Sequence, residues 1–170
     1  MSNLIFRAVA LCVVFVLAGC ATPARQQSMV PEIATEIKST GKYASSVTVR
    51  NISGGKKTNP LWVSNISNQD FGASLTSALK RRGFFSRAGP YQLDVTLLNV
   101  KQPLFGADFT VTTVVRYELK DSGGALVFQK TISADYTAKF SDHLIGVERL
   151  RLANEGSARE NIKRFLASLR

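Results

Sequence analysis

The chain has 170 residues, of which 45% are hydrophobic and 20% charged, and its net charge is +10. This length allows one globular domain together with a leader or a tether. The single histidine and the scattered carboxylates show no metal-ligand spacing, so we expect neither a metal site nor a cofactor. The positive charge favours anionic partners.

Residues 1–19 have the layout of a secretion signal. Arg7 precedes an uncharged apolar run over residues 8–18, which is shorter than the roughly 20 apolar residues that span a bilayer. The run ends in Leu17-Ala-Gly-Cys20, which resembles the lipobox of bacterial lipoproteins. The resemblance implies that Cys20 becomes the lipid-bearing first residue of the mature protein. The alternative is ordinary signal cleavage, which would leave Cys20 as a free thiol.

Processing at Cys20 would define the compartment and the mature composition. In the usual Gram-negative sorting pattern, Asp after the lipidated cysteine retains a lipoprotein at the inner membrane. Ala21 stands there instead, which implies an anchor in the outer membrane, facing the periplasm. The mature chain would have 21 basic and 12 acidic side chains and one acylated cysteine. Export excludes nucleic acid, and the expected anionic partners are phospholipid, lipopolysaccharide, peptidoglycan or an acidic envelope protein.

The predicted organisation is a lipidated tether over residues 20–45 and one domain over residues 46–170. Proline, glycine and polar residues indicate the tether. Alternating residues predict a first strand over 47–52, and a polar loop follows it. A helix should begin at Ser67, whose side chain can form a capping box with Asp70.

That first helix has its own apolar face and a clear end. Gly83 supplies a left-handed stop, and the apolar face comprises Phe71, Leu75, Ala78 and Leu79.

Three strands should follow, because apolar and polar residues alternate from Tyr91 to Leu97, from Phe109 to Lys120 and from Leu126 to Phe140. A last helix is expected from about Val147 to Leu169. The order strand, helix, three strands, helix predicts an α+β domain. In it, two helices pack on one face of a four-stranded, mainly antiparallel sheet.

Few residues suggest catalysis. Asp142 and His143 could belong to a catalytic triad, but the chain has no Gly-x-Ser-x-Gly elbow. We therefore expect His143 to be a surface residue just before the last helix. Residues 54–58 are rich in glycine and lysine but depart from the phosphate-loop pattern. We therefore name no catalytic residue.

Binding candidates are more numerous. Leu104 and Phe105 stand in the loop between the second and third strands, where they either fold back onto the sheet or contact lipid or a partner. Asn154 and Asn161 should bond buried backbone. Anion binding is expected from basic residues on the helices, namely Lys80, Arg81, Arg82, Arg149, Arg159 and Lys163.

The lipobox, the tether and the element order resemble small envelope-assembly lipoproteins, such as the plug of the lipopolysaccharide translocon and the auxiliary lipoproteins of ABC-type transporters. The resemblance covers about residues 45–170 and implies a non-enzymatic accessory or binding factor in envelope assembly or transport. Residues 58–62 resemble chains labelled sugar acyltransferase, although the hexapeptide repeats of such enzymes are absent. An envelope enzyme such as an acyltransferase and a peptidoglycan-associated structural lipoprotein therefore remain alternatives.

Overall fold

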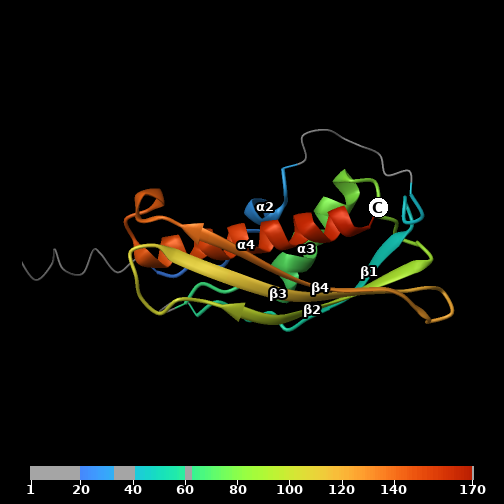
Figure 1. The fold of residues 1–170 in the computed structure, drawn as a ribbon, viewed down its shortest axis with the longest axis horizontal. Coiled ribbons are helices and arrows are strands. Elements are labelled where there is room, and N and C mark those ends of the chain that lie inside the picture. The colour runs from blue at the N-terminus through green and yellow to red at the C-terminus, as the bar shows by residue number, and fades with distance from the viewer. Residues whose placement is uncertain (1–19, 33–40, 60–62, 170) are drawn as a thin grey trace, which may run out of the picture.

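One four-stranded sheet covered on one face by helices forms the domain, as a computed structural model shows (Figure 1). The structure describes residues 20–32, 41–59 and 63–169. The predicted secretion signal, residues 1–19, lies outside the described residues. The elements in chain order are α2 (Gln26–Met29), β1 (Val47–Ser53), α3 (Asn68–Arg81), β2 (Tyr91–Lys101), β3 (Phe109–Lys120), β4 (Leu126–Ala138), the 3-10 helix η1 (Phe140–Asp142) and α4 (Gly146–Ser168).

The strands follow one another across the sheet in the order β1-β2-β3-β4. The β2–β3 and β3–β4 pairs are antiparallel, whereas β1 and β2 are parallel. The parallel pair follows from α3, which carries the chain back across one face before β2 begins. The predicted α+β class and the mainly antiparallel sheet are thus confirmed, and α2 and η1 are additional elements.

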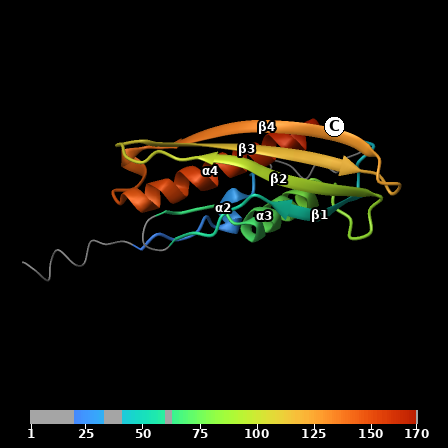
Figure 2. The same cartoon turned by 90° about the horizontal axis from the view of Figure 1, so that it is seen from below.

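Alternation along the strands gives the sheet one buried face. In β3 every second residue from Val111 to Leu119 is buried, and α3 and α4 cover this face (Figure 2). Tyr117 stacks on Phe165 of α4 with ring centroids 4.0 Å apart. Burial raises the pKa of the Tyr117 phenol well above its ordinary value.

Polar side chains of α4 also bond to the sheet. The Tyr117 hydroxyl donates to Asn161 Oδ1 at 2.8 Å, and Asn161 Nδ2 donates to the carbonyl oxygens of Thr113 and Ile132 at 3.1 and 2.9 Å. The expectation that Asn161 bonds buried backbone is confirmed. These bonds fix the position of α4 along β3 and β4, which apolar packing alone does not specify.

The outer face of the sheet carries charge. Arg50 pairs with Asp94, and Lys120 Nζ lies 3.4 Å from the same carboxylate. The hydrogen bond from Arg50 is the main reason that the pKa of Asp94 lies below its ordinary value. This face therefore presents paired charges rather than an apolar surface.

The first long helix begins and ends where the sequence predicts. Ser67 Oγ accepts a bond from the Asp70 backbone N–H at 3.0 Å and donates to Asp70 Oδ2 at 2.6 Å. Gly83 follows the helix with φ of +71°, the left-handed conformation that favours glycine. The four predicted apolar-face residues of α3 are all buried.

The described parts of the predicted tether lie on the domain rather than extending from it. Ala24 N donates to Asn65 O at 3.2 Å, and Ser74 Oγ of α3 donates to Gln26 O at 2.9 Å. Tyr43 is buried with its ring 5.1 Å from that of Tyr91. The expectation of a free tether over residues 20–45 is therefore corrected for its described residues. Small and apolar side chains account for the packing, because those of residues 21, 24, 29 and 30 are buried.

No helix within residues 20–32, 41–59 and 63–169 is long and apolar enough to cross a membrane.

Candidate functional site

A hollow of about 570 Å³ opens where α2, α3 and α4 meet. Arg81 in the last turn of α3 lines it on one side, and Arg159 and Lys163 of α4 line it on another. Glu32 and Glu160 also line the hollow. Three of the predicted anion-binding residues are thus brought together by the tertiary structure.

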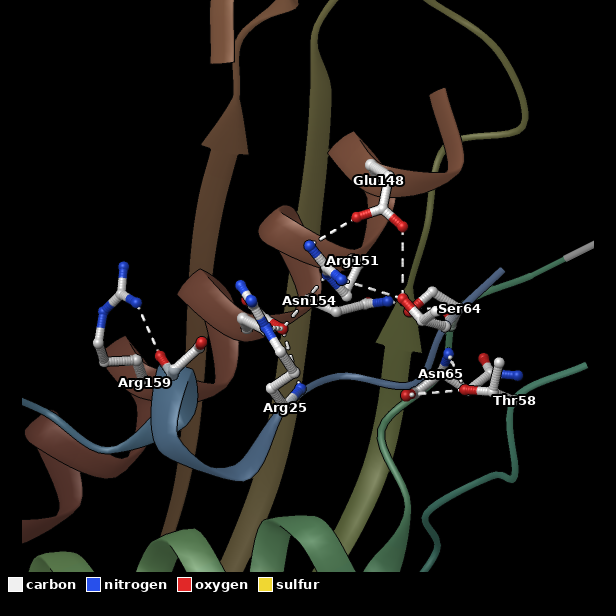
Figure 3. A network of polar contacts seen from close by, with 11 residues as sticks. Arg25, Thr58, Ser64, Asn65, Glu148, Arg151, Asn154 and Arg159 are labelled. Atoms are coloured by element: carbon white, nitrogen blue, oxygen red, sulfur yellow. Dashed lines mark hydrogen bonds and ion pairs between the residues drawn. The ribbon is translucent and has the colours of Figure 1, made fainter. Parts of the chain in front are cut away.

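These three basic residues differ in how freely their charges could meet a ligand. Arg81 is exposed, with no ion pair among the described residues, and Lys163 is exposed and pairs with Glu160 at 3.2 Å. Arg159 Nη1 donates to Ser28 O of α2 at 2.8 Å (Figure 3), and its guanidinium lies 5.5 Å from the centre of the Tyr136 ring. Arg159 therefore fixes one wall of the hollow, whereas Arg81 and Lys163 could pair with an anion.

The segment after Cys20 is held beside this hollow by a buried carboxylate. Glu155 of α4 is only 2% exposed. Its Oε1 accepts from Arg25 Nε at 3.1 Å and from the Arg25 backbone N–H at 2.9 Å, and Arg151 Nε lies 3.5 Å from it (Figure 3). The bond to Glu155 raises the pKa of Arg25. Because the buried charge is compensated from two sides, the segment has a defined place on α4.

The same segment contacts the first turns of α4 nearer to Cys20. Thr22 Oγ1 lies 3.4 Å from Glu148 Oε1 and accepts from Arg151 Nη1 at 3.0 Å. Arg151 in turn pairs with Glu148 at 2.6 Å. Cys20, which is exposed, therefore lies only two residues from the body of the domain.

The remaining basic candidates do not line the hollow. Arg149 is buried and donates to the carbonyl oxygens of His143 and Leu144 at 2.6 and 2.8 Å. It closes the connection between β4 and α4, so the structure removes it from the anion-binding set. Lys80 Nζ lies 5.0 Å from the centre of the Phe85 ring, and Arg82 is the C-cap residue of α3.

The residues that suggested catalysis bond to nearby backbone. His143 Nδ1 accepts from the Ile145 N–H at 3.1 Å, and Asp142 Oδ2 accepts from the Lys139 N–H at 2.8 Å. The His143 bond lies just before α4, as expected for a histidine before a helix, and the Asp142 bond caps η1. No group of three or more possible metal ligands occurs among the described residues.

The loop over residues 54–58 is likewise bonded within the chain. Gly55 N donates to Asn68 Oδ1 at 2.7 Å. Thr58 Oγ1 accepts from Asn65 N at 2.9 Å, as Figure 3 shows. Close by, Asn154 Nδ2 donates to Ser64 O at 2.8 Å. This confirms that Asn154, like Asn161, satisfies buried backbone.

Leu104 and Phe105 do not fold back onto the sheet. They are 94% and 86% exposed in the loop between β2 and β3. The first of the two alternatives drawn from the sequence is therefore wrong, and contact with lipid or a partner stays open.

Arg25, Glu155 and Thr22 are not among the residues predicted from the sequence. One signal was available for Glu155, because it lies three residues before Ala158 and seven before Ile162, spacings that place side chains on one face of a helix. A carboxylate at such a position requires a buried cationic partner. Nothing in the sequence identifies Arg25 as that partner, since 130 residues separate the two.

The fold is shared with solved bacterial proteins. A candidate lipoprotein from Caulobacter crescentus aligns over 74% of this chain and 88% of its own, at 16% identity and a TM-score of 0.51. A Xanthomonas campestris protein with a domain of unknown function aligns over 82% and 91%, at 12% identity and a TM-score of 0.54. A hypothetical protein from Chlamydia trachomatis aligns over 74% and 98%, at 10% identity and a TM-score of 0.51. At these identities the likeness shows the fold alone.

No family model matches the sequence, and no curated protein matches it either.

Proposed function

We propose that the protein is a bacterial envelope lipoprotein, acylated at Cys20 and anchored in the outer membrane so that its domain faces the periplasm. In this proposal it is a non-enzymatic accessory factor of envelope assembly or transport. Its ligand is an anionic envelope component that binds in the hollow between α2, α3 and α4.

The observation that carries the binding proposal is the meeting of Arg81 and Lys163 at one hollow. The two residues come from different helices, and a phosphate or carboxylate bound in the hollow would be attracted by both charges. Arg159 lies four residues before Lys163, a spacing at which like charges repel by a few tenths of a kcal/mol. A bound anion would offset that repulsion.

The anchoring proposal is supported by the sequence motif and by the position of Cys20. The lipobox ends at Cys20, and this residue is exposed, where a lipid could be attached without displacing the core. Two or more acyl chains hold a protein stably in a bilayer. The segment after Cys20, which is bonded to α4 through Thr22 and Arg25, would keep the domain close to that bilayer. One solved structure with this fold is a candidate lipoprotein.

Acylation is tested in cells supplied with labelled fatty acid. The wild-type chain should incorporate label, and Cys20→Ala should remain an unlabelled, unprocessed precursor. Label in the Cys20→Ala variant would refute the assignment.

Anion binding is tested by co-sedimentation of the chain from residue 21 onward, whose buried core lies within residues 21–169. The surfaces are anionic vesicles, neutral vesicles, lipopolysaccharide and purified cell wall. Arg81→Glu with Lys163→Glu should weaken retention on an anionic surface, and added salt should weaken it for the wild type. Arg87→Glu with Lys130→Glu is the matched control, since both residues are exposed and lie outside the hollow.

The comparison of variants decides the site. If both double variants lost the same amount of retention, the effect would come from net charge alone. That result would refute binding in the hollow. Retention by cell wall alone would instead favour the peptidoglycan-associated alternative.

A further inference from the structure

The three most exposed large apolar side chains of the described residues lie in two loops. Leu104 and Phe105 lie between β2 and β3, and Leu144, which is 77% exposed, lies between η1 and α4. Phe140 at the start of η1 and Ile145 at the N-cap of α4 are also exposed. Together these five residues form what we call the apolar end, comprising Leu104, Phe105, Phe140, Leu144 and Ile145.

One hydrogen bond joins the first loop to η1, and Arg149 contacts rings on both sides. Asp108 Oδ1, at the end of the first loop, accepts from the Phe140 backbone N–H at 2.9 Å. The buried guanidinium of Arg149 lies 5.1 Å from the Phe109 ring centre and 4.8 Å from that of Phe140. These contacts tie the end of the first loop to η1 and α4, while the side chains of Leu104, Phe105 and Leu144 remain exposed. Exposed apolar side chains on a supported backbone are typical of a contact surface.

The apolar end lies where the chain would leave the membrane. Thr22 contacts Glu148 and Arg151 in the first turns of α4, and α4 begins directly after Ile145. In both views the first described residues, the β2–β3 loop and η1 lie at one end of the long axis, away from the C-terminus (Figures 1 and 2). Only Ala21 separates Cys20 from Thr22, so an acyl group on Cys20 would bring this end against the bilayer.

Charge at this end also suits a membrane surface. Lys101 at the end of β2 and Lys139 before η1 are exposed, and they could contact anionic head groups. The nearby carboxylates of Asp108 and Asp142 accept bonds from loop backbone.

We infer that the apolar end is a second membrane-contact surface, which inserts into the same bilayer leaflet that holds the lipid on Cys20. The inference rests on the proposed function for that lipid. Two points of contact at one end would orient the domain with its long axis away from the bilayer and its C-terminal end farthest from it. The hollow lined by Arg81 and Lys163 would then be held at a constant height above the membrane.

The first experiment uses the fact that Cys20 is the only cysteine after residue 19. An acylated Cys20 has no free thiol, so Leu104→Cys creates the single site for a polarity-sensitive fluorophore in the purified, acylated protein. In vesicles of phosphatidylethanolamine and phosphatidylglycerol, the probe should emit at shorter wavelength and be quenched by spin-labelled lipid. Leu126→Cys is the matched control, because Leu126 is an exposed leucine at the other end of β4. Its probe should stay in water.

The outcomes separate this inference from the proposed function. Labelling of the parent protein, without an added cysteine, would show a free thiol at Cys20 and refute acylation. A water-like, unquenched probe at Leu104→Cys in membrane-bound protein would refute the second contact. Protection of that probe in native membranes but not in pure lipid vesicles would also overturn it, in favour of a protein occupant.

A second experiment does not depend on acylation. The unacylated chain from residue 20, carrying Cys20→Ser, should bind these vesicles. Leu104→Asp with Leu144→Asp should reduce that binding at least about tenfold, since burial of each leucine contributes appreciably, whereas Leu126→Asp should leave it unchanged. Equal binding by the double variant and the parent would refute the inference.

Discussion

The close approach of α4 to β4 depends on one glycine. A Cβ atom at Gly156 would lie 2.3 Å from both Cγ and Cδ1 of the Tyr136 ring. Carbon atoms pack best at about 3.5–4.0 Å, so Gly156→Ala requires the ring or the helix to move by roughly 1 Å or more. Movement of the ring would also disturb its contact with Arg159.

Gly72 provides a matched control. It too lies inside a long helix, but a Cβ there would meet only the flexible side chain of Ile52, at 3.0 Å. In both helices alanine is favoured over glycine by about 1 kcal/mol. Overpacking costs about 1–3 kcal/mol, and it applies mainly to Gly156. The difference between the two variants should therefore be about 1–3 kcal/mol, since the helix-propensity gain cancels.

The assay is equilibrium denaturation of the chain from residue 20, followed by circular dichroism. Gly72→Ala should be neutral or more stable than the parent, and Gly156→Ala should be the less stable of the two variants. A Gly156→Ala variant as stable as Gly72→Ala would refute the steric argument and show that Tyr136 moves aside without cost.

Three further predictions concern the cap of α3, the docked segment and the buried phenol. Ser67→Ala should lower the free energy of unfolding by about 1 kcal/mol, because α3 loses its N-cap; an unchanged denaturation midpoint would contradict this. Glu155→Gln should make residues 21–32 exchange amide hydrogens faster, because Arg25 loses its ionic partner, while exchange in β3 stays the same. Equal protection of residues 21–32 in both proteins would show that Glu155 does not hold this segment on the domain. The raised pKa of Tyr117 belongs to the folded state, so its contribution to stability is present below about pH 10 and declines as pH rises past the ordinary phenol pKa. An absorbance titration should show that Tyr117 ionises only as the protein unfolds, and a Tyr117→Phe variant whose titration before unfolding differs from that of the parent would contradict it.

The sequence by itself determined the local elements. Period-two alternation indicates which face of β3 is buried, because successive side chains point to opposite sides of a strand. Ser67 and Gly83 mark the ends of α3, since capping and left-handed backbone depend on a few neighbouring residues. The motif over residues 17–20, which resembles a lipobox, is equally local. These features could be predicted because the residues that cause them are close together in the chain.

Only the tertiary structure decided which distant residues meet. The parallel pairing of β1 with β2 depends on where α3 packs, and alternation within a strand carries no information about its neighbour. Residues 21–31 resemble a linker in composition, but Arg25 within them bonds to Glu155, more than a hundred positions away. The same holds for the hollow, where packing of the helices brings Arg81 together with Lys163 and leaves Arg149 buried elsewhere. The net charge predicts that an anion could bind, but only the arrangement of the helices decides which cations line the same hollow.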